Sequence, residues 1–188
     1  MLDEPLTVAL LRSKLSEWYH SRRRELPWRE DPTPYRVWVS EIMLQQTQVA
    51  TVIPYFERFI AAFPSIEALA EATDDEVTAQ WAGLGYYRRC RHLHQAAKVV
   101  HETLDGLLPR EVEQLMALPG IGRYTAGAIA SIAFGVVAPV LDGNVARVLS
   151  RLIALDLEVD GGAGKRALWG TADILVDPHD PSSHNQAM

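Results

Sequence analysis

Residues 118–123 have the sequence Leu-Pro-Gly-Ile-Gly-Arg and lie between two segments with helical apolar spacing, Glu111–Ala117 and Arg123–Phe134. Two glycines two positions apart permit backbone conformations closed to other residues, and they would let a phosphate group approach the main chain. The loop leads into a helix N-terminus, where free N–H groups and the helix dipole favour an anion. These residues predict a phosphate-holding turn between helices, although glycine-bearing turns also join helices for purely structural reasons.

The rest of the chain also predicts helices, and no alternating strand pattern competes with them. Ser65 is a suitable N-cap, and Thr73 with Glu76 three residues later indicates a capping box. Gly83-Leu84-Gly85 should break a helix. The further predicted helices are Leu6–Tyr19, Tyr35–Ala50, one from about Pro54 to Phe63, Ile66–Ala70, Arg88–Leu104 and Val145–Leu155.

Composition limits the class of protein. With 188 residues, 48% hydrophobic and 22% charged, the chain can form one domain with a small second lobe, and it is not a disordered protein. No apolar run approaches the ~20 residues of a membrane helix, and Met1–Pro5 does not resemble a signal peptide, so we expect a cytoplasmic protein. Cys90 is the only cysteine, which excludes a cysteine-only metal cluster built from this chain alone.

Charge is segregated along the chain. The net charge is −6, which argues against a generic nucleic-acid binder. Yet Val77–His101 carries +4 and Gly120–Arg151 carries +2, whereas Leu152–Met188 carries −4. Because distant acids are screened beyond ~8–10 Å, a local basic face can still bind phosphates. The alternative is an ordinary solvated helix face.

The loop at Leu118–Arg123 resembles the helix-hairpin-helix motif, which holds the DNA backbone without reading sequence. Together with further blocks in the same order, it resembles the A/G-specific adenine DNA glycosylases, from about Leu11 to the last residue. The blocks with Glu41 and with Gly-Leu-Gly-Tyr-Tyr are specific to that family. The six blocks are Leu26–Arg29, Ser40–Val49, Gly83–Arg88, Leu118–Arg123, Leu141–Arg147 and Asn185–Met188.

The resemblance implies an all-α, two-lobed helix-hairpin-helix DNA glycosylase fold that holds the substrate base between its lobes. Residues 1–25 would form an N-terminal helix of the second lobe. Residues 26–140 would form the catalytic lobe, with the hairpin at about 111–134. Residues 141–188 would begin the second lobe and carry Asp142, leaving that lobe incomplete.

The resemblance also implies the catalytic groups. Glu41 matches the general acid that protonates adenine, and burial on an apolar helix should raise its pKa. Asp142 matches the carboxylate that stabilises or captures the sugar cation, with Asn144 as its orienting partner and Tyr124 at the pocket edge. From the residues alone, Glu41 could instead be a buried structural acid, and Asp142 or Asn144 a helix N-cap.

DNA contacts follow from the same resemblance. Gln45 and Tyr86 match residues that wedge into the duplex near the mispair, and Gln46 lies beside them; Tyr86 could alternatively be a core aromatic. Base extrusion costs a few kcal/mol of unstacking, so such residues must hold the gap open. The residues expected to hold the DNA backbone are Arg88, Leu118, Gly120, Gly122 and Arg123.

The residue just after the hairpin predicts the type of glycosylase. The bifunctional relatives, which resemble endonuclease III, place a lysine just after the hairpin and form a Schiff base with the sugar. Here Tyr124 takes that place, and the helix after Asp142 offers Ala146 and Arg147. We therefore expect a monofunctional glycosylase, acting as a monomer on double-stranded DNA with adenine opposite 8-oxoguanine or guanine.

The chain departs from the family beyond Met188. Family members carry a [4Fe-4S] cluster on four later cysteines and a C-terminal recognition domain, so we expect a truncated chain that binds no metal. Leu6–Tyr19 should then lose its partners and expose Val8, Leu11 and Leu15. Two alternatives stay open: a non-catalytic DNA-binding module, or a glycosylase for oxidised pyrimidines or mismatched thymine.

Overall fold

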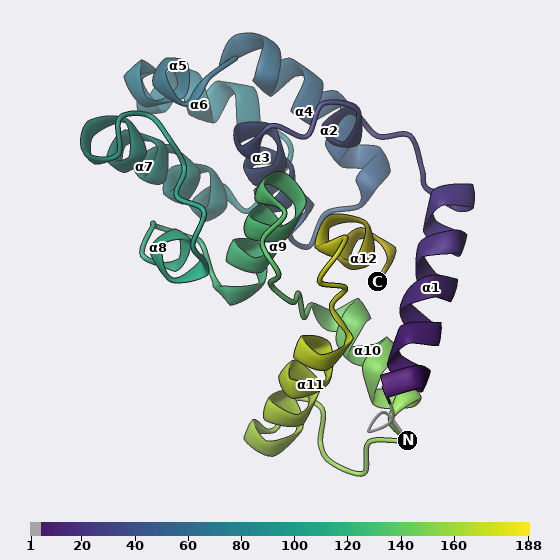
Figure 1. The fold of residues 1–188 in the computed structure, drawn as a ribbon. Helices are drawn as coiled ribbons and strands as arrows, with labels where there is room; N and C mark the ends of the chain where they lie inside the picture. The colour runs from purple at the N-terminus through teal and green to yellow at the C-terminus, as the bar shows by residue number, and fades with distance from the viewer. Residues whose placement is uncertain (1–4) are drawn as a thin grey trace.

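The computed structural model describes residues 5–188, and every regular element in this part of the chain is a helix (Figure 1). The prediction of an all-α chain is confirmed. The helices are α1 (Pro5–Arg22), α2 (Pro27–Glu30), α3 (Pro34–Leu44), α4 (Val49–Ala62), α5 (Ile66–Glu71), α6 (Asp74–Trp81), α7 (Tyr87–Thr103), α8 (Val112–Met116), α9 (Arg123–Phe134), α10 (Gly143–Leu152), α11 (Gly162–Leu175) and α12 (Pro181–Ala187).

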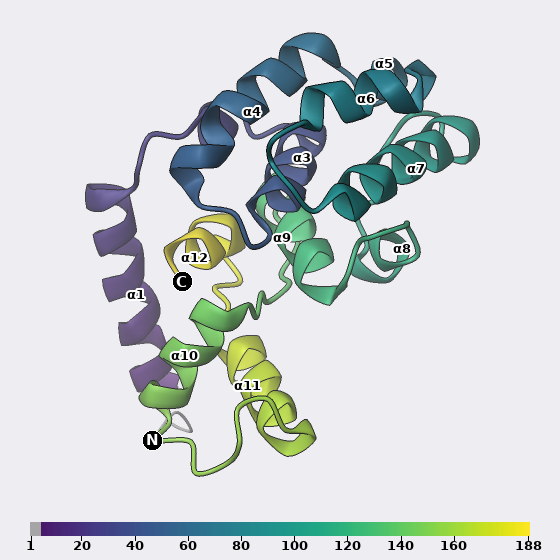
Figure 2. The ribbon, with the colours of Figure 1, turned by 180° about the vertical axis from the view of Figure 1, so that it is seen from behind.

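The helices enclose two hydrophobic clusters. The larger one lies among α2 to α9 and includes Trp38, Phe59 and Trp81, all fully buried. The smaller one lies among α1, α10 and α11 and includes Leu149 and Leu168. Helix α9 contributes apolar residues to both clusters, and Figures 1 and 2 show α9 and α12 between the two groups of helices. The boundary between the clusters therefore runs along α9.

The predicted helix over Tyr35–Ala50 is wrong at its end. Helix α3 stops at Leu44, a turn follows, and α4 begins at Val49. Gln46 has a φ of 57°, which no right-handed helix accommodates. Helix α4 also begins five residues before the predicted start at Pro54, which it contains as an interior residue.

The sequence analysis did not predict three of the helices. Two of them, α2 and α12, are short and begin with proline, which suits the first helical turn. The third, α11, contains Gly162, Gly164 and Gly170, and glycine lowers helix propensity. Its helical form depends on burying Leu168 and Ala172 in the smaller cluster, a tertiary effect that outweighs local propensity.

The expected loss of partners for α1 is also wrong. Val8 is 7% exposed and packs in the smaller cluster, and Leu11 and Leu15 are half-buried. The guanidinium of Arg12 donates to the carbonyl oxygens of Leu175 and Ile174, 3.1 and 2.8 Å away. Helix α1 thus lies against α12 (Figure 2) and also contacts α11.

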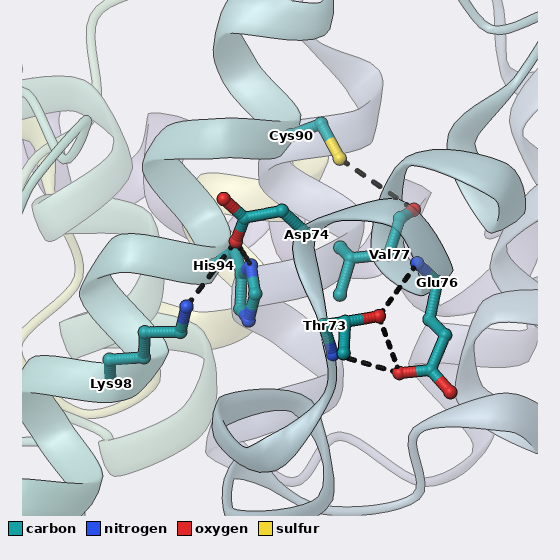
Figure 3. Close-up of polar contacts among 7 residues, drawn as sticks. All are labelled: Thr73, Asp74, Glu76, Val77, Cys90, His94 and Lys98. Carbon is teal, nitrogen blue, oxygen red and sulfur yellow. Dashed lines mark hydrogen bonds and ion pairs between the residues drawn. The ribbon is translucent and has the colours of Figure 1, made fainter.

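Polar contacts tie α6 to α7 (Figure 3). The predicted capping box is confirmed: Thr73 Oγ1 accepts from the Glu76 N–H, and Glu76 accepts from the Thr73 N–H. Asp74 contacts His94 Nδ1 at 3.0 Å and Lys98 Nζ at 3.3 Å. Lys98 is therefore paired with an acid, and it adds little to the basic face that the sequence suggested.

Cys90 lies in the same region, with its thiol directed toward the carbonyl oxygen of Val77 (Figure 3). The residue is 2% exposed, and burial raises the pKa of its thiol to about 11. A thiol that stays protonated and buried is a weak nucleophile. Cys90 is therefore a packing residue.

An extended segment after α9 carries the chain to Asp142. It crosses α9 at Gly127, where an added Cβ would collide with the carbonyl oxygen of Pro139. Asn185 on α12 holds the same segment, because its amide donates to the Ala138 carbonyl oxygen at 2.7 Å and to Ser131 Oγ at 2.8 Å. The position of Asp142 therefore depends on this close approach.

Two helical glycines offer a matched test. Gly127→Ala should lower the free energy of unfolding by about 1–3 kcal/mol, because Pro139 must move away from the new methyl group. Gly170→Ala on α11 meets open space and should raise it by about 0.5–1 kcal/mol. Urea denaturation followed by circular dichroism measures both. Equal effects of the two changes would contradict the close approach at Gly127.

Candidate active site and nucleic-acid interface

A cleft of about 830 Å³ opens where the end of α3 meets the starts of α7, α9 and α10. A second cavity of about 390 Å³ lies beside it, and both are lined by Glu41, Leu44, Tyr124 and Asp142. The predicted residues that line the larger cleft are Glu41, Gln45, Gln46, Tyr86, Arg88, Tyr124 and Asp142. Residues from four separate helices thus converge on one place.

Glu41 lies on α3 between the two cavities. Burial and, to a lesser extent, the negative charge of Asp142 raise the pKa of its carboxyl group, whereas the hydroxyl of Tyr124 and the charge of Arg29 lower it; the resulting pKa is about 7. Glu41 therefore holds a proton through a large part of the neutral range. A carboxyl group with such a pKa suits general acid catalysis.

Tyr124 lies in the first turn of α9 beside Glu41, and it is close enough to Asp142 for that charge to act on its hydroxyl group. Both negative charges and burial raise the pKa of its phenol, so the hydroxyl keeps its proton. Tyr124 is thus a hydrogen-bond donor beside the two carboxyl groups. It offers no amine nucleophile.

Asp142 fills two roles at once. Its Oδ1 accepts from the Val145 N–H at 2.8 Å, which makes it the N-cap of α10, as the structural alternative proposed. Its Oδ2 accepts from Asn144 Nδ2 at 3.3 Å, and Asn144 Oδ1 accepts in turn from Arg147 at 3.3 Å. These contacts fix the direction of a carboxylate that lines both cavities.

The predicted wedge residues lie on two turns at the rim. Gln45 ends α3, and its amide donates to Thr125 Oγ1 on α9 at 3.3 Å. Tyr86 has a φ of 51° and is 58% exposed, against 40% for Tyr87. The alternative of Tyr86 as a core aromatic is therefore wrong.

The predicted hairpin residues do different things. Gly120 has a φ of 77°, and a Cβ there would lie 2.5 Å from the Cβ of His92. The turn therefore requires glycine for two reasons, its backbone conformation and the lack of space for a side chain. Gly122 is the N-cap of α9 and faces open space. Leu118 is 5% exposed, so its predicted DNA contact is limited to its main chain, because the side chain belongs to the core. The guanidinium of Arg123 lies 3.8 Å from the ring centre of Trp169 on α11.

Two arginines at the site were not assigned by the sequence analysis. Arg29 on α2 lines the second cavity, called the inner cavity below, and its positive charge lowers the pKa of Glu41. Arg89 on α7 lines the cleft and contacts the end of α3. Arg29 is the last residue of one quoted block and Arg89 directly follows another, but basic residues are common at helix surfaces, and nothing local distinguished these two.

The described residues, 5–188, contain no group of three or more His, Cys, Asp or Glu side chains suited to a metal ion. With Cys90 as the only cysteine, the chain cannot by itself ligate a cluster through four thiolates, so its residues do not fit the [4Fe-4S] group that the resemblance implies. Within the same range, no helix has the length and apolar character needed to cross a membrane.

Known proteins share this sequence and fold. Adenine DNA glycosylase of Homo sapiens is 50% identical over 96% of this chain and 35% of the relative. Adenine DNA glycosylase of Buchnera aphidicola subsp. Schizaphis graminum is 39% identical over 97% of this chain and 53% of the relative. The chain thus spans about a third to a half of the length of these curated relatives.

Solved structures agree on the fold. A thermostable thymine-DNA glycosylase superposes with a TM-score of 0.86 at 27% identity, covering 96% of this chain and 83% of that one. A trapped endonuclease III–DNA covalent intermediate gives a TM-score of 0.78 at 22% identity, covering 97% and 83%. Residues 39–162 match the family described as HhH-GPD superfamily base excision DNA repair protein. The chain, with its glycine hairpin before α9 and two carboxyl groups at one cleft, therefore belongs to the HhH-GPD superfamily of base excision DNA repair proteins.

Proposed function

We propose that this chain forms the glycosylase part of an adenine DNA glycosylase, which removes adenine mispaired with 8-oxoguanine or guanine from double-stranded DNA. The observation that carries the proposal is the pairing of two carboxyl groups with different roles at one cavity. Glu41 is poised to hold a proton near neutral pH, and Asp142 is fixed in direction by Val145 and Asn144. Curated relatives named adenine DNA glycosylase, at 38–50% identity, support the same substrate.

The geometry accounts for the chemistry of base release. An extruded base would enter the inner cavity, and Glu41 would donate its proton to a ring nitrogen as the N-glycosidic bond breaks. Asp142 would face the positive charge that develops on the sugar. Water then adds its hydroxide to the sugar carbon and releases a proton, which completes a hydrolysis. Tyr124 occupies the place of the nucleophilic lysine, so no Schiff base forms.

A second candidate has one observation in its favour. The solved structure with a TM-score of 0.86 is a thymine-DNA glycosylase, and its fold covers 96% of this chain. A site for mismatched thymine would use the same cleft and the same Asp142. The two candidates differ in the need for a proton donor that reaches a purine ring nitrogen, which Glu41 supplies.

Base release from three duplexes separates these functions. We expect the purified chain to release adenine opposite 8-oxoguanine and opposite guanine, and to leave thymine opposite guanine intact, because Glu41 faces the cavity as an acid. Borohydride should trap little covalent complex, since Tyr124 replaces the lysine. Preferred release of thymine, or efficient trapping with strand cleavage, would refute the proposal. Tight duplex binding without any base release would favour the DNA-binding module.

Replacing Glu41 tests the proton donor. Glu41→Gln keeps the shape of the side chain but removes the proton, so single-turnover adenine release should fall by about 10²–10⁴. In the wild-type protein, release should decline above pH about 7, where Glu41 ionises. Glu57→Gln, an exposed change on α4, is the control and should leave release unchanged.

The same substitution has a consequence for stability with a defined sign. The pKa of Glu41 is about 7 in the folded state and 4.5 for an unperturbed glutamate, so the folded state loses stability as pH rises from 4.5 through 7. At pH 8, the free energy of unfolding of Glu41→Gln should therefore exceed that of wild type by about 1–3 kcal/mol, and the variant should melt at a higher temperature. Thermal melts at pH 5 and pH 8 measure this. A variant that loses both stability and release would indicate a structural acid.

The hairpin glycines test backbone recognition. Gly122→Ala meets open space, so it should keep the melting temperature but weaken binding to duplexes of any sequence, because the new methyl group lies where a phosphate approaches. Gly120→Ala should lower both stability and binding, since its φ is positive and His92 is in the way. Fluorescence anisotropy at several salt concentrations measures the affinity, which should fall steeply with salt. Unchanged affinity of Gly122→Ala would exclude the hairpin from the interface.

A further inference from the structure

The C-terminus of α3, which precedes the Gln45–Thr47 turn, is held by a side chain from another helix. An α-helix leaves its last carbonyl groups without partners inside the helix. One terminal nitrogen of the Arg89 guanidinium donates to the carbonyl oxygens of Ile42 and Met43, 2.9 and 3.0 Å away. It also donates to that of Gln45. The negative end of the α3 dipole thus receives a cation.

The same group fixes the turn beyond the helix. Its second terminal nitrogen donates to Thr47 Oγ1 at 3.2 Å, and the Thr47 N–H donates to the Leu44 carbonyl oxygen at 3.2 Å. Gln46, the middle residue of this turn, has a φ of 57°, a left-handed conformation that is strained for a residue other than glycine. A planar guanidinium offers several donors in a rigid arrangement, which suits it to hold a strained turn.

Arg89 also contacts the second rim residue. Its guanidinium lies 4.9 Å from the ring centre of Tyr86 and 5.8 Å from that of Trp81. Tyr86 has a φ of 51° and an exposed ring. A single side chain therefore contacts Tyr86 directly and restrains Gln46 through its two neighbours, Gln45 and Thr47.

The contacts of Arg89 distinguish it from the arginines of the basic face. Arg88 and Arg91 are exposed, whereas Arg89 is half-buried, with both terminal nitrogens engaged by protein oxygens. Within residues 5–188, no carboxylate lies at ion-pair distance from it. Helix-end carbonyls rather than an acid compensate its charge. Because both terminal nitrogens donate to protein oxygens and Nε is buried without a partner, Arg89 is not placed as a phosphate ligand.

We propose that Arg89 is the positioning residue of the DNA-inserting rim, holding the Gln45–Thr47 turn and Tyr86 as one preformed unit in the free protein. The inference rests on the proposed function, because it assumes that this rim enters the duplex to extrude a base. Preformed insertion groups spend none of the binding energy on ordering themselves. Loss of Arg89 should therefore impair base extrusion more than binding of intact DNA.

The matched control is Arg110, which donates to the carbonyl oxygen of Phe134 at the end of α9 and lies 5.7 Å from the ring centre of that residue. Arg110→Gln removes the same kind of helix-end contact away from the cleft. Arg89→Gln removes the tie under test, and Arg89→Lys keeps the charge with fewer directed donors. If Arg89→Gln does not fold, the comparison of Arg89→Lys with Arg110→Gln tests the positioning role instead.

The first measurement uses the free protein. Hydrogen exchange of the Thr47 amide should be about tenfold faster or more in Arg89→Gln, intermediate in Arg89→Lys and unchanged in Arg110→Gln. The turn should loosen because it loses its donors while the remaining structure is kept. Wild-type exchange at Thr47 in a folded Arg89 variant would overturn the proposal.

The second measurement follows base extrusion directly. The probe is a duplex with 2-aminopurine in place of the adenine opposite guanine, whose fluorescence rises when the base unstacks. With saturating protein, the rise should be about tenfold smaller in Arg89→Gln than in wild type, while affinity for an undamaged duplex stays within about threefold. Arg110→Gln should match wild type in both.

The outcomes separate the two proposals. A folded Arg89→Gln variant that unstacks the probe as wild type does, or that loses unstacking and duplex affinity together, would contradict the positioning role alone. Wild-type protein that neither unstacks the probe nor releases adenine would contradict the proposed function, and with it the role of the rim.

Discussion

The need to keep one carboxyl group protonated near neutral pH dominates this structure. Glu41 lies on α3, which also carries the fully buried Trp38 and Met43, and it faces cavities on two sides. Withholding water from an acid raises its pKa, but it also makes the ionised form costly to the folded state. The large apolar cluster around α3 offsets that cost. Stability and chemistry therefore oppose each other at this residue, as they often do at functional sites.

The second carboxylate reaches the site through backbone packing. Asp142 lies on a separate helix from Glu41, and its place is set by the extended segment that crosses α9 at Gly127 and is held by Asn185. A larger residue at Gly127 would move the segment away from α9. Asn185 lies in the Asn-Gln-Ala-Met block, so the last described helix has a clear structural role: it holds the extended segment that leads to Asp142.

The rim of the cleft stores conformational strain. Gln46 and Tyr86 both adopt left-handed backbone conformations without being glycine, and both lie at the mouth of the cleft. Such residues persist only where the surroundings over-determine them. The contacts of Arg89 with the end of α3 and with the ring of Tyr86 supply that restraint. A strained but fixed rim suits the proposed insertion into a base stack.

The sequence by itself determined the all-α class, the glycine hairpin, most helix positions and the residues that gather at the cleft, because these depend on local periodicity, capping and turn chemistry. It could not place the end of α3 at Leu44 or find α11, since tertiary contacts outweighed local propensity there. It also assigned Leu118 to DNA and left Arg29 and Arg89 aside, because burial and charge environment arise only when distant segments meet. Only the tertiary structure decided that Asp142 is both cap and cleft carboxylate, and that the carboxyl group of Glu41 titrates near neutrality.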